Sequence, residues 1–307
     1  MLSFQKLLKA QQISKDDLSK LFYQADIYKD KLENKQIITD LQGKILASLF
    51  FEPSTRTRFS FESAMHRLGG SVISLENGAS SSTKKGETLN DTGKVIDQYA
   101  DIIVMRHPQP HSVEEFSKYV TAPVINAGDG ENEHPTQSLV DLYTIHSELG
   151  DLKNLKIGFI GDLKYGRTVH SLVKILTKFD CSFTFISSDY LQIPSKLRDF
   201  IIQNGNSFEE HEKVNSQLLE GLDVLYVTRV QKERFPSEEI YRKNKDLCYL
   251  DRKHISATSD FIILHPLPRV DEMDRTIDDL PCAKYFEQVR YSVPIRMALL
   301  ALLVNKS

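Results

Sequence analysis

The most constraining feature of the sequence is a polar turn that joins an apolar segment to an amphipathic one. Residues 44–51 are apolar over the length of a strand, and residues 61–68 carry apolar side chains at helical spacing before a Gly-Gly pair. Pro53 disfavours helix at Glu52, and Ser54 is a favourable N-cap residue. The segment therefore predicts a strand, a turn and a helix whose free N-terminal N–H groups bind an anion, phosphate above all.

The same turn supplies side chains that suit phosphate. It reads Phe-Glu-Pro-Ser-Thr-Arg-Thr-Arg over residues 51–58, so two hydroxyls and the guanidiniums of Arg56 and Arg58 are available to phosphate oxygens. A lone Ser-Thr-Arg would be interpreted as a helix cap and a solvated face. The whole run resembles the carbamoyl phosphate signature of the aspartate and ornithine carbamoyltransferases. The resemblance implies carbamoyl phosphate contacts from Ser54, Thr55, Arg56 and Thr57.

The bulk properties of the chain narrow its class. Its 307 residues, 40% of them hydrophobic, can bury the cores of two domains. A formal net charge of -3 gives no basic surface for nucleic acid. No stretch approaches the ~20 apolar residues of a membrane span, and no secretory signal is recognisable. We therefore expect a soluble, cytoplasmic protein that binds neither nucleic acid nor membrane.

The cysteines indicate neither disulfides nor a metal site. Cys181, Cys248 and Cys282 lie far apart and form no C-x-x-C or Cys/His cluster. We expect three ordinary thiols and no metal. The family resemblance likewise implies that no cofactor is needed.

Strand-like and helix-like segments alternate along the chain, which predicts an α/β fold with mainly parallel sheets flanked by helices. The first helix is expected at 13–35, opened by Ser14 and two aspartates. A helix from 135 to about 149 ends at a glycine, where a domain boundary fits. We expect further strands at 71–75, 101–105, 123–127, 156–162, 183–186, 224–227 and 261–264.

Two doubly wound domains follow from this pattern: a carbamoyl phosphate-binding domain at 1–150 and an aspartate-binding domain at 151–284. The C-terminal helix, 285–307, is expected to cross back and complete the first domain. Its segment 291–304 is apolar nearly all round, which predicts burial, with Pro294 near the start of the helix. By resemblance, Arg296 helps to lock the domains together.

Two further strand ends in the first half carry polar residues. Arg106 follows a β-branched run, at the end of a strand where α/β sheets bind ligands. His-Pro-Thr-Gln at 134–137 follows a Gly-Asp-Gly loop and places proline at the first helical position. A paired arginine and a packed core histidine are the alternatives from the residues alone. His-Pro-Thr-Gln is the family's second signature, which implies that Arg106, His134 and Thr57 donate to the carbonyl oxygen of carbamoyl phosphate while Gln137 holds its amino group.

A polar loop at 76–86 contains serines and two adjacent lysines. Such a charge pair is usually solvated surface. The loop resembles the family's mobile loop, which enters the active site of the neighbouring subunit, and so implies a homotrimer with shared sites. Ser81 and Lys85 would bind carbamoyl phosphate and Lys85 would also meet aspartate, with Lys84 as the alternative register. The resemblance thus implies five catalytic residues: Arg56, Thr57, Lys85, Arg106 and His134.

The second half presents two arginines at expected ligand-binding positions. Gly-Phe-Ile-Gly-Asp at 158–162 is compatible with a dinucleotide site, but the full G-x-G-x-x-G is absent. Arg167 instead opens a predicted helix, and Arg229 and Gln231 follow the strand at 224–227. Each arginine alone also fits a structural ion pair, but two guanidiniums suit a dicarboxylate. The resemblance implies that Arg167, Arg229 and Gln231 bind aspartate.

Two segments distinguish the aspartate branch of the family from the ornithine branch. Where ornithine enzymes carry Ser-Met-Gly and His-Cys-Leu-Pro, this chain has Arg-Val-Gln at 229–231 and His-Pro-Leu-Pro-Arg at 265–269. Both differences favour aspartate. The resemblance also implies carbamoyl phosphate contacts from Leu267 and Pro268, with the carbonyls of Pro266 and Leu267 accepting from the reacting nitrogen atoms.

The resemblance covers nearly the whole chain and implies a transferase that moves the carbamoyl group of carbamoyl phosphate to the α-amine of L-aspartate, the committed step of pyrimidine synthesis. No dedicated general base is evident, and the departing phosphate is expected to take the amine proton. The sequence leaves open whether regulatory chains or a larger pyrimidine-pathway complex join the trimer. It also leaves two alternative functions open, a carbamoyltransferase with another acceptor and a dinucleotide-binding or non-catalytic α/β protein.

Overall fold

The computed structural model describes residues 1–76, 86–230, 232, 235–256 and 259–305. The chain divides into two compact units, Met1–Tyr143 with Arg290–Ser307, and Thr144–Val289. Both boundaries between the units fall inside helices, the first inside α5 (Pro135–Leu149) and the second inside α10 (Tyr285–Val304). The chain therefore returns to the first unit at its C-terminal end.

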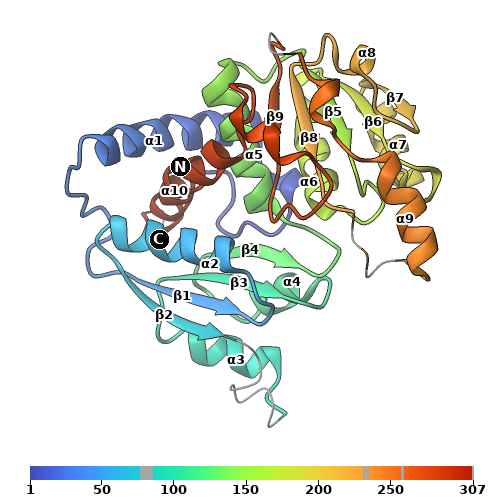
Figure 1. The fold of residues 1–307 in the computed structure, drawn as a ribbon. Coiled ribbons are helices and arrows are strands. Elements are labelled where there is room, and N and C mark those ends of the chain that lie inside the picture. Colours follow the sequence, from blue (N-terminus) through green and yellow to red (C-terminus); the bar gives the residue numbers. More distant parts are fainter. Residues whose placement is uncertain (77–85, 231, 233–234, 257–258, 306–307) are drawn as a thin grey trace. The chain divides into compact units, whose positions relative to one another are not determined.

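The first unit is built on a parallel sheet in the order β2-β1-β3-β4. Its strands are β1 Ile45–Phe50, β2 Ser71–Glu76, β3 Ile102–His107 and β4 Val124–Asp129. Its helices are α1 Lys15–Glu33, α2 Thr55–Arg67, α3 Leu89–Ile96 and α4 Ser112–Ser117. Figure 1 shows α2 on one face of the sheet and α3 and α4 on the other. On the α4 side, Ala47, Leu49, Ile103 and Met105 pack with Val113 and Phe116.

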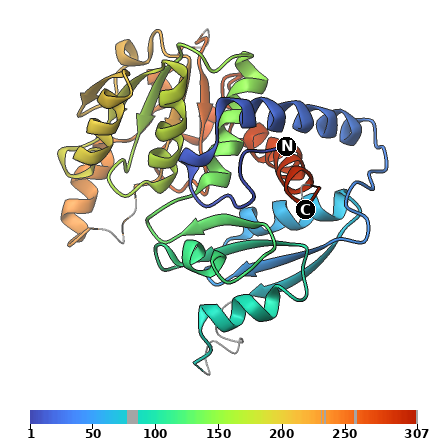
Figure 2. The ribbon, with the colours of Figure 1, turned by 180° about the vertical axis from the view of Figure 1, so that it is seen from behind.

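The second unit contains a five-stranded parallel sheet in the order β7-β6-β5-β8-β9, with helices on both faces (Figure 2). Its strands are β5 Lys156–Ile160, β6 Ser182–Ile186, β7 Ser207–His211, β8 Val224–Val227 and β9 Ile262–Leu264. Its helices are α6 Arg167–Leu176, α7 Ser195–Gln203, α8 Ser216–Leu219 and α9 Glu238–Leu247. Short 3-10 helices in the chain lie at Ala10–Gln12, Thr177–Phe179, Asp189–Leu191, Arg252–His254 and Arg275–Asp279. The predicted fold class is thereby confirmed.

Local signals explain where several helices begin. The Ser14 side chain accepts a hydrogen bond from the Asp17 N–H at 3.0 Å, and Asp17 accepts from the Ser14 N–H at 3.0 Å. This capping box confirms the predicted start of α1. Pro135 is the first residue of α5, as its missing N–H and fixed φ favour.

Two features of the fold differ from the prediction. Pro294 lies in the interior of α10 rather than near its start, because the helix begins at Tyr285, as the expected bounds 285–307 have it, and not at the apolar segment 291–304. The strand β7 was not predicted. Its sequence, Ser-Phe-Glu-Glu-His, is polar because it is the edge strand of its sheet and has only one strand neighbour. Among the described residues, no helix combines the length and apolarity needed to cross a bilayer.

A close backbone approach between β5 and β8 depends on Gly161. Its φ is +121°, and a Cβ there would lie 2.2 Å from the carbonyl oxygen of Thr228. Thr228 in turn donates its N–H to the Ile160 carbonyl at 2.8 Å. Only glycine allows the two strand ends to meet in this way.

Replacing Gly161 with alanine is therefore expected to lower the free energy of unfolding by about 3 kcal/mol, from backbone strain and the clash with Thr228. Gly205→Ala is the matched control, since Gly205 also has a positive φ (+77°) but no atom within 4 Å of its added Cβ. It should cost only about 1 kcal/mol. Urea unfolding measures both, and equal losses would contradict the role assigned to the Thr228 contact.

Candidate active site

In each sheet the chain adds strands first on one side of its first strand and then on the other. Several of the candidate residues lie at the point where this direction changes. In the first unit the point lies between β1 and β3, and in the second between β5 and β8. At such switch points the loops leaving the two strands diverge, which opens a crevice at the carboxyl edge of the sheet. The turn after β1 and Arg106 lie at the first point, and the loops leading to Arg167 and Arg229 lie at the second.

Pairing between β1 and β3 brings the phosphate-type turn beside Arg106. Phe50 is the register partner of Arg106, and the Phe51 N–H donates to the Arg106 carbonyl at 2.9 Å. The turn then leads directly into α2, whose N-cap residue is Ser54. The strand-turn-helix prediction is confirmed, and the helix begins at the carboxyl edge of the sheet.

The first turn of α2 is not capped in the expected way. Ser54 occupies the N-cap position, but its side chain makes no capping hydrogen bond. The predicted N-cap position of Ser54 is confirmed, but its hydroxyl does not cap the helix. The physical reason is the backbone of Ser54, whose ψ of 88° departs from that of the well-capped helices, where ψ is near 160°. The helix end thus keeps its positive potential for an anion.

The two arginines of the turn have different surroundings. Arg58 lies over the Phe59 ring at 4.9 Å, with its Nε 3.8 Å from Glu62 Oε1 on the next turn of α2. Glu62 also accepts hydrogen bonds from Ser48 and Ser74. The structure therefore gives Arg58 an ion-pair partner of its own, whereas the Arg56 side chain is exposed near the helix start.

Arg106 is a nearly buried cation held by groups from three segments. Its Nε donates to Glu52 Oε2 at 3.0 Å, and its Nη1 donates to the Ala127 carbonyl at 3.4 Å. The same Nη1 lies 3.5 Å from Nε2 of His134. Its guanidinium plane is thus fixed by a carboxylate, a carbonyl and an imidazole.

The loop before His134 is organised by the buried carboxylate of Asp129. It accepts hydrogen bonds from the N–H groups of His111 and Glu133 at 2.8 and 3.1 Å, and from the side-chain amides of Asn126 and Asn132 at 2.9 Å each. Asp129 is only 1% exposed. Four donors around one buried carboxylate fix the turn, and the next residue after Glu133 is His134.

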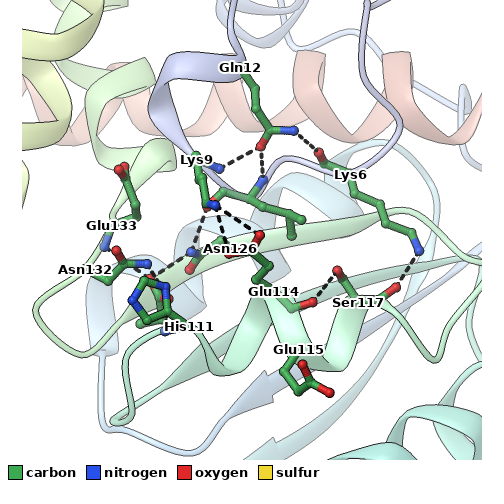
Figure 3. Close-up of polar contacts among 12 residues, drawn as sticks. Lys6, Lys9, Gln12, His111, Glu114, Glu115, Ser117, Asn126, Asn132 and Glu133 are labelled. Atoms are coloured by element: carbon green, nitrogen blue, oxygen red, sulfur yellow. Dashed lines mark hydrogen bonds and ion pairs between the residues drawn. The ribbon is translucent and has the colours of Figure 1, made fainter.

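The N-terminal segment braces this loop from outside the sheet, as Figure 3 shows. Leu7 bridges to Ile125 of β4, and the Asn126 side-chain amide donates to the Leu8 carbonyl at 3.0 Å. The Ala10 N–H donates to Glu133 Oε2 at 3.2 Å. Both sides of the turn before His134 therefore rest on residues more than a hundred positions away.

His134 and Gln137 lie at the start of α5. His134 is 5% exposed, with its Nδ1 3.5 Å from the Thr136 hydroxyl. The Gln137 amide donates to Asp141 Oδ1 at 2.7 Å, one turn along the helix. This bond orients the Gln137 side chain, and it leaves the amide oxygen and one N–H of Gln137 for other groups.

At the switch point of the second unit, Arg167 is the first residue of α6 and follows a tight turn. Asp162, which is 1% exposed, accepts from the Tyr165 N–H at 2.9 Å, and the Arg167 N–H donates to the Tyr165 carbonyl at 2.9 Å. Arg229 follows β8 directly after Thr228 and is half-buried. Both arginines therefore emerge at the carboxyl edge of the sheet, from the two strands that flank the switch point.

The loop after β9 is the third polar element of the second unit. The His265 ring accepts from the Leu267 N–H at 2.8 Å through Nδ1 and contacts Glu272 Oε1 at 2.8 Å through Nε2. Burial raises the pKa of Glu272, but hydrogen bonds from His265 and the Val270 N–H outweigh it and hold that pKa below its ordinary value. In the same loop the Arg269 guanidinium binds both carboxylate oxygens of Asp278. The Leu267–Pro268 peptide bond is cis.

Comparisons with known proteins agree with a candidate binding region in each unit. Residues 5–147 match the family model for the carbamoyl-P binding domain of aspartate/ornithine carbamoyltransferases, and residues 153–303 match the model for their Asp/Orn binding domain. The chain belongs to the aspartate/ornithine carbamoyltransferase family.

Within this carbamoyltransferase family, the chain is similar to aspartate enzymes. It is 48% identical to the aspartate carbamoyltransferase catalytic subunit of Methanocaldococcus jannaschii over 300 residues, covering 97% of each chain. A solved structure of the M. jannaschii catalytic subunit has a TM-score of 0.92 at 46% identity and covers 99% of each chain. The Trypanosoma cruzi aspartate transcarbamoylase, solved with carbamoyl phosphate and aspartate, has a TM-score of 0.89 at 40% identity, covering 96% of this chain and 95% of that one.

Four residues predicted for this carbamoyltransferase site lie outside the described residues. They are Ser81, Lys84, Lys85 and Gln231. The other predicted residues fall into two sets, one in each unit. Those of the first are Ser54, Thr55, Arg56, Thr57, Arg106, His134 and Gln137, and those of the second are Arg167, Arg229, Leu267 and Pro268.

The structure adds positioning residues that the sequence analysis did not single out. Glu52 orients Arg106, Asp129 organises the loop before His134, and Glu272 holds His265. Glu52 and His265 stand inside the quoted motifs, so their place in those motifs was an available signal. Asp129 stands in the Gly-Asp-Gly loop quoted with the second signature, and three of its four donors lie within four residues of it, so it too had a local signal. Glu272 carried no comparable signal, since the sequence does not show that it contacts His265.

Proposed function

We propose that this chain transfers the carbamoyl group of carbamoyl phosphate to the α-amine of L-aspartate, giving N-carbamoyl-L-aspartate and phosphate in pyrimidine synthesis. One observation carries the proposal. The phosphate-type groups of the first unit and the two arginines of the second each lie at the switch point of their own sheet. An acyl phosphate site and a dicarboxylate site are what these two substrates require.

In the first unit, the N-terminal end of α2 with Ser54, Thr55, Arg56 and Thr57 binds the phosphate, and Arg106, His134 and Gln137 bind the carbamoyl group. Arg106 only donates, so its 3.5 Å contact uses the lone pair of His134 Nε2. A substrate carbonyl oxygen that enters here replaces this contact. In the His134 tautomer that carries the ring proton on Nε2, the oxygen receives hydrogen bonds from both side chains as negative charge develops on it.

The reaction is an acyl transfer that needs no cofactor. The lone pair of the aspartate amine attacks the carbamoyl carbon, a tetrahedral intermediate forms, and the carbon–oxygen bond to phosphate breaks. The proton lost by the amine passes to the departing phosphate. The protein therefore acts chiefly by positioning the two substrates and stabilising charge.

In the second unit, Arg167 and Arg229 each bind one carboxylate of aspartate, aided by Gln231. The carbonyl groups of Pro266 and Leu267 accept from the reacting nitrogen atoms, and Leu267 and Pro268 contact carbamoyl phosphate. Lys85 and Ser81 complete the site in this proposal.

Product formation from carbamoyl phosphate with either aspartate or ornithine tests the proposal directly. Turnover with aspartate and none with ornithine is the expected result. Turnover with ornithine would move the chain to the sister activity, and turnover with neither would refute the proposed acceptor.

We further propose a homotrimer in which Lys85 of each chain enters the site of its neighbour. The cytoplasmic location of the protein and its binding of regulatory chains stay predictions. Mixing inactive Lys85→Ala chains with inactive Arg56→Ala chains is then expected to restore about one third of wild-type activity per mixed trimer, because one site receives neither lesion. Activity of purified mixed trimers is the measurement.

The control for this mixing experiment pairs Arg56→Ala with Arg106→Ala. Arg56 and Arg106 of a given site come from the same chain in this scheme, so every site carries one of the two lesions and no activity should return. Recovery in this control, or none in the Lys85 mixture, would count against a shared site.

A further inference from the structure

The loop that follows β9 is held together by the buried imidazole of His265. His265 is 1% exposed and comes directly after the last residue of β9. Its Nδ1 lies 2.8 Å from the Leu267 nitrogen and its Nε2 lies 2.8 Å from Glu272 Oε1. One side chain thus links the beginning of the loop to its end.

These partners determine where the ring carries its proton. The Leu267 backbone N–H is a donor in every protonation state, so His265 Nδ1 must present its lone pair to it. The ring proton is then on Nε2, where it is donated to Glu272. The contact between His265 and Glu272 is therefore a hydrogen bond between a neutral imidazole and a carboxylate, not an ion pair between two charges.

Glu272 and Gln288 fix this arrangement from both sides. Glu272, 1% exposed, also accepts from the N–H groups of Val270 and Asp271 at 3.1 and 3.2 Å. The backbone N–H of His265 donates to the Gln288 side-chain oxygen at 3.0 Å. Neither the imidazole nor the carboxylate can rotate without leaving a buried polar group unpaired, which makes the tautomer and the ring orientation a fixed property of the fold.

The consequence for the backbone follows from the planarity of the peptide unit. The N–H of Leu267 and the C=O of Pro266 belong to one trans peptide, so they point in opposite directions in a common plane. When His265 holds the N–H, it also aims the Pro266 carbonyl away from the ring. Pro266 and Leu267 are half-buried at the carboxyl edge of the sheet, one strand away from Arg229.

We infer that His265, held in one tautomer by Glu272, is a positioning residue that aims the Pro266 carbonyl at a reacting nitrogen atom. The inference rests on the proposed function, because that function assigns the carbonyl to a substrate. His265 itself contacts no substrate in this scheme, and it acts through the Pro266–Leu267 peptide.

Two substitutions separate the two hydrogen bonds of the ring. In His265→Asn the amide oxygen lies near the place of Nδ1 and accepts from Leu267, but the side chain is too short to reach Glu272. In His265→Gln the amide nitrogen lies near the place of Nε2 and donates to Glu272, but the Leu267 N–H loses its acceptor. We expect kcat at saturating carbamoyl phosphate and aspartate to fall about 100-fold in His265→Gln and no more than about 5-fold in His265→Asn.

A merely structural role would not lower kcat more in His265→Gln than in His265→Asn. To remove any effect of unfolded protein, kcat is calculated per folded molecule. Hydrogen exchange at the Leu267 amide should stay slow in His265→Asn and become fast in His265→Gln. The matching substitutions His211→Asn and His211→Gln on β7, away from the candidate site, should leave kcat unchanged. Equal losses of kcat in both His265 variants, or slow Leu267 exchange in both, would overturn the inference.

The wild-type protein provides a readout that needs no variant. Nitrogen-15 chemical shifts of the His265 ring should report a neutral ring protonated on Nε2, and protonation on Nδ1 would overturn the inference. A wild-type chain that makes no carbamoyl aspartate would instead refute the proposed function. The ring shifts and the Leu267 exchange would still test the hydrogen bonds, so the two failures are distinguishable.

Discussion

Replacing Arg106 with alanine is expected to lower kcat about 10³-fold. The guanidinium is nearly buried between Glu52, the Ala127 carbonyl and His134, so it is preorganised to donate where negative charge develops. Removing one such donor typically costs about 10²–10³ in kcat, and here the hydrogen bond to Glu52 is lost as well. Steady-state kinetics with saturating aspartate measure the effect.

The control for Arg106 is Arg290→Ala in the same unit. Arg290 pairs with Glu33 at 2.7 Å, but its side chain is 67% exposed, so its loss should leave kcat unchanged within about twofold. Arg106→Lys keeps the charge without the fork and should recover only part of the activity. A loss below about tenfold in Arg106→Ala would contradict a role in stabilising the transition state.

Replacing Arg229 with alanine is expected to lower kcat/KM for aspartate about 10³-fold, since two charge-assisted hydrogen bonds to one carboxylate are lost. The proposed phosphate-binding residues lie in the other unit, so the inhibition constant of inorganic phosphate should not change. Initial rates at varied aspartate, with and without phosphate, measure both quantities.

Arg242→Ala is the matched control for Arg229 in the second unit. Arg242 is 75% exposed on α9 and pairs with Glu238, and its loss should leave KM for aspartate unchanged. An unchanged KM and kcat in Arg229→Ala would exclude Arg229 from aspartate binding. A parallel loss of phosphate inhibition would show that the substitution disturbs the fold rather than one carboxylate contact.

Much of the fold was predictable because its signals are local. The capping box at Ser14, the proline that opens α5 and the apolar runs of β1, β3, β5 and β8 each lie within a few residues of the element they specify. The edge strand β7 was not predictable in this way, since its side chains are polar and its pairing with β6 is fixed by the rest of the sheet. The interior position of Pro294 was missed because the apolar segment 291–304 begins only three residues before it, whereas α10 begins at Tyr285.

By itself the sequence determined which residue types stand at the strand ends, among them Arg106, His134, Arg167 and Arg229. The tertiary structure alone decided which of them are neighbours. The strand orders place the turn after β1 beside Arg106, and they bring the segment after β5 beside Thr228. Some groups that hold functional side chains in place also become neighbours only on folding, such as Ala127 and His134 beside Arg106. The physical reason is that propensity and periodicity act over about ten residues, whereas strand order and buried hydrogen bonds depend on contacts between distant segments.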